Sequence, residues 1–447
     1  MADNYILLER VELNASAASI SFNNIPQTGY TDLKIVMSAR LDVNDVQVKM
    51  QFNSDTTSAN YSWRRIYGDG AAATSDNGTN LIAGSANGAN STTSTFGNME
   101  WYIPNYTSSN KKSVSSDQVT ENNATTAYTT LSAFLWQGTA AINQITLSTN
   151  TSGNFVSGST FSLYGIAALG TTPVIAPKAI GGNRIDNDGT YWYHTFTSSG
   201  TFAPLQGITA DVLMVSGGGG GSNNGGVGSG GGGGALYYSA ANLFTANTSV
   251  PITVGAGGPR DTTSSGPGGA GSLSQFSSTS VSVSNGATGG SGIAGNGGAS
   301  KKVISGTTTN YTGGSGTGTE PNRQGGGGAG AGANGSNASG AGTMTGGAGL
   351  NTYSGWASAT GTGVSGYYGG GGGGGFEGSG TFSQASGGAG GGGGGGAGTT
   401  APLYNAGDGV ANTGGGGGGC GGRSGVVGGA SGNGGSGIVI IRYPIAS

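Results

Sequence analysis

The sequence predicts an all-β fold combined with polyglycine-II. It divides into a jelly-roll-like β-sandwich over residues 1–167, a linker over 168–182 and a glycine-rich domain over 183–447. Three observations lead to this prediction. Short segments of the first half alternate between apolar and polar residues, as half-buried strands do. Runs of four to seven consecutive glycines recur in the second half, and strong β segments bracket the glycine-rich region at both ends.

The segment 46–52 is the clearest strand of the first half. Its apolar residues fall on one face, and Gln47, Lys49 and Gln51 fall on the other. Polar, turn-rich pieces separate this segment from others of the same kind, and together they predict eight or more short strands, most simply a jelly roll. The other segments are 5–13, 19–22, 32–39, 62–67, 99–103, 129–136, 142–147 and 160–167.

The stretch 168–182 follows neither a strand nor a helix period. It contains Pro173 and Pro177 and ends in two glycines, which is typical of a linker. The composition changes after it, because only about 15 of the 101 glycines precede Thr190. In the second half, β segments are expected at 190–215, with a hairpin around residues 198–200, at 249–254 and at 437–443.

The glycine runs have two interpretations. Glycine-rich sequence of low complexity usually forms a flexible linker, because it buries too little apolar surface to offset chain entropy. Here, however, large aromatic residues lie between the runs, whereas flexible linkers are poor in aromatics. The runs also have comparable lengths: residues 217–221, 230–234, 325–328, 369–375, 390–396 and 414–419.

A bundle of threefold extended helices fits these runs better. Such a helix rises about 3.1 Å per residue, so seven glycines form a rod of about 22 Å. Its N–H and C=O groups point outward in three directions, and each buried group must find a partner on a neighbouring rod. Only residues without a Cβ let backbones approach on every side. The sequence therefore predicts a hydrogen-bonded slab of packed glycine helices.

Both halves resemble domains of bacteriophage proteins. The phrases YWYHTFTSSGTF (191–202), VPITVGAGG (250–258) and GGSGIVIIRYP (434–444) resemble the glycine-rich domain of tail-fibre proteins. The glycine runs are similar in kind to the polyglycine-II sandwich of the adhesins at the fibre tips of T-even phages. In the first half, IPQTGYTDLKIVMSAR (25–40) and GSTFSLYGIA (158–167) resemble a β-sandwich domain common in phage virion proteins. The resemblance implies attachment to the virion or oligomerisation for the first half, and receptor binding for the second.

Composition and charge argue against several other classes. Only 8% of residues are charged and the formal net charge is −3, which gives no electrostatic footprint for nucleic acid or an anionic membrane. No apolar stretch approaches the roughly 20 residues of a membrane span, and no signal peptide is expected. Cys420 is the single cysteine, so no intrachain disulfide is expected.

The sequence offers little catalytic chemistry. His194 is the single histidine and lies in an alternating strand pattern, which favours a structural or surface role. Cys420 has no second histidine to act as its base. Asp186 and Asp188 form the only close carboxylate pair of the second half; they indicate a turn more than a calcium site. We therefore expect no enzyme activity, no cofactor and no metal, with Asp186 and Asp188 as weak calcium candidates.

Aromatic residues between the late glycine runs are the candidates for receptor binding. Exposed rings supply contact area at low entropic cost and stack well on sugars. The alternative is that these rings cover the ends of the slab and keep water from the rods. The candidates are Tyr353, Trp356, Tyr367, Tyr368, Phe376 and Tyr404.

These observations lead to one functional hypothesis and its alternatives. The first is a non-enzymatic tail fibre or fibre-tip adhesin on the virion surface, made in the host cytoplasm, that binds a bacterial surface polysaccharide or outer-membrane protein. It is expected to attach to other virion proteins through the N-terminal domain and to form a homotrimer, without binding nucleic acid or inserting into a membrane. The alternative is a capsid-decorating or head-fibre protein without an obligatory receptor. Two further functions are disfavoured. The sequence lacks the regular threonine array that ice binding would use, and it lacks the carboxylate pairs that a depolymerase would use.

Overall fold

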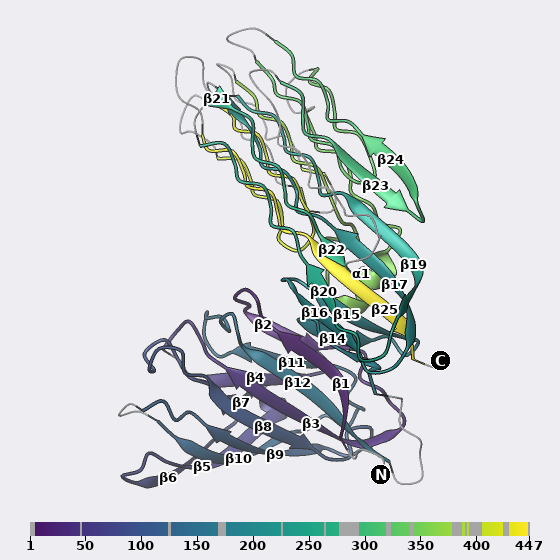
Figure 1. The fold of residues 1–447 in the computed structure, drawn as a ribbon. Coiled ribbons are helices and arrows are strands. Elements are labelled where there is room, and N and C mark those ends of the chain that lie inside the picture. The colour runs from purple at the N-terminus through teal and green to yellow at the C-terminus, as the bar shows by residue number, and fades with distance from the viewer. Residues whose placement is uncertain are drawn as a thin grey trace. The chain divides into compact units, whose positions relative to one another are not determined.

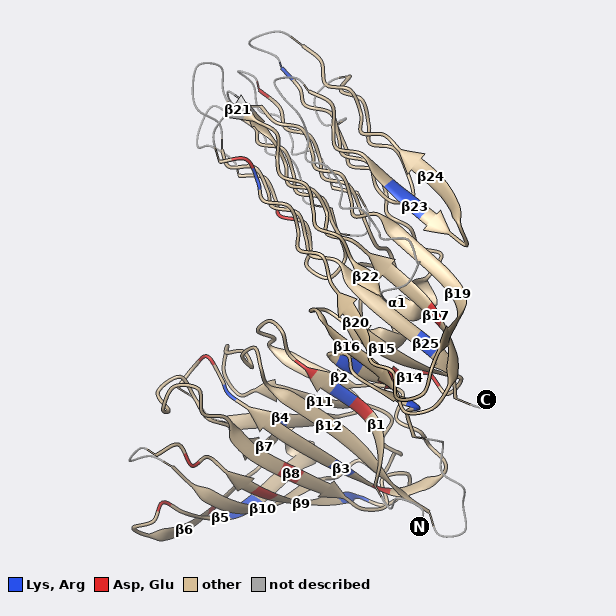
Figure 2. Ribbon diagram, in the orientation of Figure 1, with Lys and Arg blue, Asp and Glu red and all other residues tan. Residues whose placement is uncertain are grey.

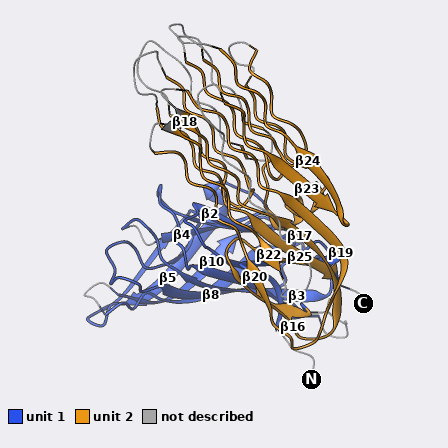
Figure 3. Ribbon diagram, turned by 45° about the horizontal axis from the view of Figure 1, so that its top comes forward, with its two compact units in different colours: residues 1–177, 183–192, 444–447 blue, residues 178–182, 193–443 orange. Residues whose placement is uncertain are grey.

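A computed structural model describes most of the chain and divides it into two compact units (Figure 3). Unit 1 comprises Met1–Pro177, Asn183–Trp192 and Pro444–Ser447, and unit 2 comprises Lys178–Gly182 and Tyr193–Tyr443. The described residues are 5–44, 47–123, 127–168, 176–224, 227–262, 265–276, 295–318, 323–339, 344–377, 387–388, 391–392, 405–422 and 429–445.

Unit 1 is built from antiparallel strands in two sheets (Figure 1). The larger sheet has the strand order β14-β1-β12-β3-β8-β9-β10-β5-β6, and the smaller has the order β2-β11-β4-β7. A short 3-10 helix, Ser58–Asn60, precedes β5. The strands are β1 (Tyr5–Glu12), β2 (Ser19–Phe22), β3 (Tyr30–Ala39), β4 (Gln47–Phe52), β5 (Tyr61–Gly68), β6 (Ala73–Gly78), β7 (Ile82–Ser85), β8 (Gly97–Ile103), β9 (Lys112–Val119), β10 (Thr129–Trp136), β11 (Ile145–Thr149), β12 (Thr160–Ala167) and β14 (Arg184–Asn187).

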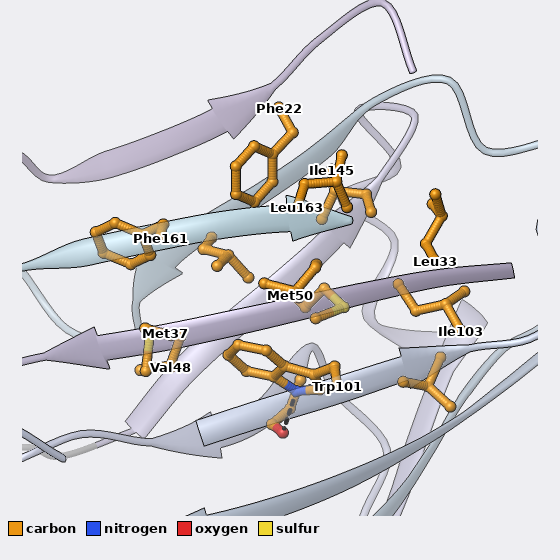
Figure 4. Close-up of a cluster of buried hydrophobic side chains, with 14 of the residues drawn as sticks. Phe22, Leu33, Met37, Val48, Met50, Trp101, Ile103, Ile145, Phe161 and Leu163 are labelled. Atoms are coloured by element: carbon orange, nitrogen blue, oxygen red, sulfur yellow. Dashed lines mark hydrogen bonds between the residues drawn. The ribbon is translucent and has the colours of Figure 1, made fainter. Parts of the chain in front are cut away.

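The two sheets of unit 1 enclose a continuous apolar core (Figure 4). The alternation predicted around 46–52 is confirmed in β4, where Val48, Met50 and Phe52 are fully buried. The indole of Trp101 lies in the same core, and its Nε1–H donates to the carbonyl oxygen of Ala83 at 3.0 Å. Because that bond satisfies the one polar atom of the side chain, burial of the ring leaves no polar group without a hydrogen-bond partner.

The described part of unit 2 contains short strands, the helix α1 and long glycine-rich segments between them (Figure 1). One series of strands has the order β24-β23-β19-β17-β25, in which the β19–β23 pair is parallel. Further sheets are β13-β16-β20-β22 and β18-β21. The elements are β13 (Ala179–Ile180), β16 (Gly200–Pro204), β17 (Ile208–Val215), β18 (Asn223–Asn224), β19 (Leu236–Phe244), β20 (Val250–Thr253), β21 (Ser265–Gly266), β22 (Gln275–Phe276), β23 (Ser300–Ile304), β24 (Thr307–Tyr311), α1 (Ser354–Thr360) and β25 (Ile438–Pro444); β15 (Tyr191–Phe196) spans the division between the units.

The region around residues 168–202 differs from its prediction in two ways. The hairpin expected around 198–200 is wrong, because β15 and β16 belong to different sheets and β16 pairs with β13 and β20 instead. The division of the chain also does not follow a linker at 168–182, since Lys178–Gly182 lies in unit 2 and Asn183–Trp192 lies in unit 1. Ala179–Ile180 forms a strand because its backbone pairs with β16 in antiparallel orientation.

Backbone hydrogen bonds join the glycine segments with a spacing of three residues. Each amide of residues 216–222 donates to a different segment from the amides on either side of it, and every third amide returns to the same segment. Ser216, Gly219 and Ser222 donate to Ala235, Gly232 and Ser229; Gly217 and Gly220 donate to Ser272 and Gly269; Gly218 and Gly221 donate to Gly435 and Gly432. This part of the chain is therefore ordered by bonds directed to three sides.

The run 369–375 has the same arrangement. Gly372 and Gly375 donate to Gly231 and Gly228, three residues apart on one neighbouring segment. Amides of two other segments donate to the run at the same spacing: Ala331, Gly328 and Gly325 bond to Gly369, Gly372 and Gly375, and Gly416 and Gly419 bond to Gly370 and Gly373. These bonds connect residues far apart in sequence, so the slab is held by long-range contacts.

The close approach of these backbones requires residues without a Cβ. A Cβ built on Gly372 would lie 2.0 Å from the carbonyl oxygen of Gly417, and one on Gly221 would lie 2.0 Å from that of Gly418. No carbon can occupy such positions without moving the neighbouring backbone. The expectation that glycine is a steric requirement in these runs is thus met at both positions.

Candidate functional site

The glycine segments have two distinct ends, and the candidate site lies at one of them. At one end, here called the strand end, the segments continue into β17, β19 and β25. The other, the far end, is where β18 pairs with β21 (Figure 1). Several residues from distant parts of the sequence lie at the far end, including Asn223, Asp261, Arg323, Glu377 and Gly422. Figure 2 shows that charged residues are sparse along the segments, so the charges at this end stand out.

An ion pair between Arg323 and Glu377 is the strongest polar contact of the far end. The guanidinium binds both carboxylate oxygens; Nη2 lies 2.6 Å from Oε1, and Nε donates to Oε2. Glu377 is fully buried, and its amide donates to the carbonyl oxygen of Arg323 at 2.9 Å. Planar, two-point pairing of this kind fixes geometry as well as charge. The pair therefore fixes Arg323 and Glu377 relative to each other at the far end.

Asn223, Asp261 and Cys420 fix other positions at the same end. The Sγ of Cys420 donates to Oδ1 of Asn223 at 3.0 Å, and both residues are buried. Oδ2 of Asp261 accepts the amide of Gly266, in β21, at 2.8 Å. Glu377 and Gly422 form a parallel bridge. Far-end positions from distant parts of the sequence are therefore held in a fixed relation to one another.

Four of the aromatic receptor-binding candidates are buried. Tyr353, Trp356, Tyr368 and Phe376 all expose less than a tenth of their surface. Tyr367 is half-buried. Tyr404 lies outside the described residues. A buried ring has no surface to offer a receptor, so these four positions favour the alternative in which the rings pack the protein itself.

The rings also lie at opposite ends of the glycine segments. Tyr353 and Trp356 belong to the region of α1 at the strand end, where the Tyr353 ring lies 4.9 Å from that of Tyr238 and the guanidinium of Arg442 lies 4.4 Å from the centre of the Trp356 ring. Phe376 lies at the far end and packs against Met344. The structure therefore does not bring the candidates together into one surface.

Asp186 and Asp188 make contacts other than those of a calcium site. Arg184 lies between Asp186 and Glu9; its Nε is 2.6 Å from Oδ1 of Asp186, and its Nη2 donates to Glu9. Burial raises the pKa of both carboxyl groups, that of Glu9 well above its usual value. Oδ1 of Asp188 instead accepts the amides of Thr190 and Tyr191 at 2.9 and 2.8 Å, as in a turn. Within the described part of the chain, no group of three or more His, Cys, Asp or Glu residues is arranged to hold a metal.

Sequence reasoning missed the contacts that organise the far end. Arg323 and Glu377 are 54 positions apart, and neither belongs to a charge pattern that suggests a partner. The signal that could have been read is the presence of single charged residues beside glycine runs, because a lone charge next to buried backbone needs a partner.

The described residues contain no helix of the length and apolar character that a membrane span requires.

The comparisons with known proteins place the second half of the chain in a family. A family model described as a glycine-rich domain matches residues 196–444. No curated protein matches the sequence. The matched region covers more than half of the 447 residues and contains the glycine segments, the strands that bracket them and the far end. The chain belongs to this glycine-rich domain family.

Proposed function

We propose that this chain is a non-enzymatic bacteriophage virion protein, a tail fibre or fibre-tip adhesin, whose glycine-rich unit displays loops to bind a receptor on the host cell surface. The observation that carries the proposal is the three-residue hydrogen-bond spacing, which joins segments distant in sequence and holds the starting points of several chain connections at the far end. A rigid scaffold that presents variable connections is the usual arrangement of binding proteins.

Within this proposal the glycine segments adopt polyglycine-II. Bonds to three sides with a period of three residues are what a threefold extended helix offers its neighbours, and the 2.0 Å approach of an added Cβ at Gly372 to the Gly417 oxygen supports the same geometry. The two antiparallel sheets of unit 1 support a jelly-roll-like sandwich.

The receptor contact is assigned to the far end and not to the buried rings. Its ligand is a bacterial surface polysaccharide or an outer-membrane protein, and unit 1 attaches the chain to other virion proteins. The protein acts on the virion surface as a homotrimer, in which several weak contacts add to avidity. No cofactor or catalytic residue takes part.

Competition for adsorption tests the proposal. Purified full-length chain, added in excess to bacteria that the parent phage infects, is expected to reduce the rate of phage adsorption. The matched control is the same chain with residues 423–428, which follow Gly422 in the sequence, replaced by a Gly-Ser segment of equal length; it is expected to compete less. Normal adsorption at saturating wild-type protein would refute receptor binding.

A phage that lacks the protein separates the proposal from its alternative. Loss of infectivity with intact particles supports an adhesin. If particles without the chain adsorb and infect normally, the chain is a capsid-decorating or head-fibre protein. Labelling the chain on whole particles and imaging them gives a second readout, because an adhesin lies on the fibre and a decoration protein on the capsid.

A further inference from the structure

One face of the large sheet of unit 1 carries exposed apolar side chains. In β9 the residues alternate strictly between buried and exposed, so the face opposite the core is well defined. Leu131 of β10 pairs directly with Ile66 of β5 on one side and with Asp117 of β9 on the other. Leu131 is 52% and Ile66 59% exposed, which is unusual for neighbouring aliphatic side chains. The three residues form one row across the outer face.

A second row on the same face contains a charge without a partner. Ala133 of β10 pairs with Arg64 of β5 and with Ser115 of β9. The side chains of Arg64 and Asp117 make no hydrogen bond or ion pair with any residue that the structure describes. The two charges lie on strands to either side of β10, about 10 Å apart across the sheet.

The other charges of this face are satisfied within the chain. Nζ of Lys34 lies 2.7 Å from Oε2 of Glu100, on the neighbouring strand. Oδ2 of Asp32 accepts a hydrogen bond of 2.7 Å from the hydroxyl of Tyr102. Arg64 and Asp117 are therefore exceptions on a face that otherwise pairs its charged groups.

The face around Ala133 is also hollowed. A depression of about 580 Å³ is lined by residues of β5, β6, β9 and β10, among them Arg64, Ile66, Leu131 and Ala133. Exposed aliphatic groups beside a depression leave apolar surface in contact with water, and covering that surface stabilises an assembly by about 25 cal/mol per Å².

We propose that this face is where copies of the chain meet around the threefold axis of a homotrimer, so that the occupant is a second copy of this chain. Ile66 and Leu131 pack near the axis, and Arg64 of one copy forms an ion pair with Asp117 of the next. The inference rests on the trimer of the proposed function and specifies the surface that forms it.

Charge complementarity within the face favours a second copy over an unrelated partner. Asp117 on β9 stands at one end of the row that contains Leu131 and Ile66, and Arg64 on β5 lies two residues from Ile66, at the other end. Rotation about an axis that passes near β10 brings the β5 side of one copy to the β9 side of its neighbour. Arg64 of each copy then pairs with Asp117 of the next copy, so the three copies form a closed ring in which all six of these charges are paired. A partner of a different sequence would need both features by coincidence.

A charge exchange on the full-length chain tests this surface. The wild-type mass, measured by light scattering after size exclusion, is expected to be three times the 43.0 kDa of the chain. Arg64→Asp and Asp117→Arg each place like charges together three times per trimer. Each is expected to raise the concentration at which the trimer half-dissociates by more than about tenfold. The double variant Arg64→Asp/Asp117→Arg restores opposite charges and is expected to recover most of the loss.

The controls separate assembly from folding and from receptor binding. Lys301→Asp makes a comparable charge change in unit 2 and is expected to leave the mass unchanged. Thermal unfolding of the single variants at high concentration checks that they fold. A trimer that persists in both single variants, or a double variant that stays dissociated, refutes this surface and leaves the receptor proposal standing. A wild-type chain that remains monomeric also refutes it and leaves a different protein as the occupant, whereas failure of the adsorption assay with an intact trimer refutes only receptor binding.

Discussion

The ring of His194 links two parts of unit 2 that are distant in sequence. Its Nδ1 lies 2.7 Å from the carbonyl oxygen of Gly181, and its Nε2 lies 3.0 Å from the hydroxyl oxygen of Tyr443. Because a carbonyl oxygen only accepts, Nδ1 carries the proton and Nε2 accepts from the tyrosine. Both rings are buried and stack at 5.6 Å. Burial lowers the pKa of His194 to about 4, so the imidazole stays neutral in the folded protein.

The neutral histidine makes the stability of unit 2 depend on pH. The folded-state pKa is depressed from 6.5 to about 4, so its stabilising contribution is complete above pH 6.5 and is lost as the pH falls towards 4. The full effect is on the order of 3 kcal/mol. Amide hydrogen exchange of β15 and β25, followed by mass spectrometry at several pH values, measures it. His194→Gln, which cannot titrate, is expected to flatten the profile; an unchanged slope in this variant would assign the effect to another group.

The buried carboxyl groups of unit 1 make stability depend on pH in the opposite direction. Burial raises the folded-state pKa of Glu9 above 4.5, so its contribution to stability is complete below pH 4.5 and is lost as the pH rises through the higher folded-state value. Glu9→Gln mimics the protonated acid. The stability of this variant relative to wild type is expected to increase with pH, measured by urea unfolding with hydrogen exchange of β1 and β14. A constant difference across pH would mean that the pKa of Glu9 is the same in the folded and unfolded states.

Gly372→Val tests the steric requirement of the glycine segments. The added side chain meets the Gly417 carbonyl at 2.0 Å, so the slab must open and unit 2 is expected to unfold or aggregate. Circular dichroism and melting of the full chain measure this. Gly355→Ala is the matched control, because it lies in α1 with no atom within 4 Å of its added Cβ. It is expected to be neutral or to stabilise by up to about 1 kcal/mol. Equal tolerance of both changes would indicate a flexible linker.

The Arg323–Glu377 pair should behave as a buried ion pair. Glu377→Ala removes the carboxylate that the Arg323 guanidinium binds and is expected to destabilise the far end by about 3–5 kcal/mol. Replacing both residues by leucine removes both charges and is expected to recover most of that loss. Hydrogen exchange at Gly375 and Gly422 reports the local effect. If Glu377→Ala and the double variant are equally unstable, packing of the side chains and not their charge accounts for the loss.

Strands with a simple alternation were predictable from the sequence. The bounds of 19–22, 129–136 and 160–167 are confirmed as β2, β10 and β12. β9 was missed because the side chains on its inner face include Ser116 and Gln118, which carry no apolar signal although both are buried. The α-helix α1, the only one among the described residues, is too short to show a period; it is held by contacts of Trp356 with Tyr193, 5.9 Å away, and with Arg442.

The candidate site was less predictable than the fold. Aromatic residues beside glycine runs were reasonable receptor contacts, yet a ring beside a slab that excludes water is stabilised by burial, as Tyr368 and Phe376 are. Whether an aromatic side chain faces the interior or the solvent depends on what the neighbouring segments cover. That information is not local to the residues themselves.

The sequence by itself determined that one half of the chain alternates as strands do and that the other half demands residues without a Cβ. Only the tertiary structure decided which glycine segment bonds to which, and therefore which residues meet at the far end. The physical reason is that the bonds between segments join backbone groups. Every glycine presents the same N–H and C=O, so no side chain records that Gly372 pairs with Gly231 or that Gly218 pairs with Gly435. The long-range packing of the whole unit supplies that choice.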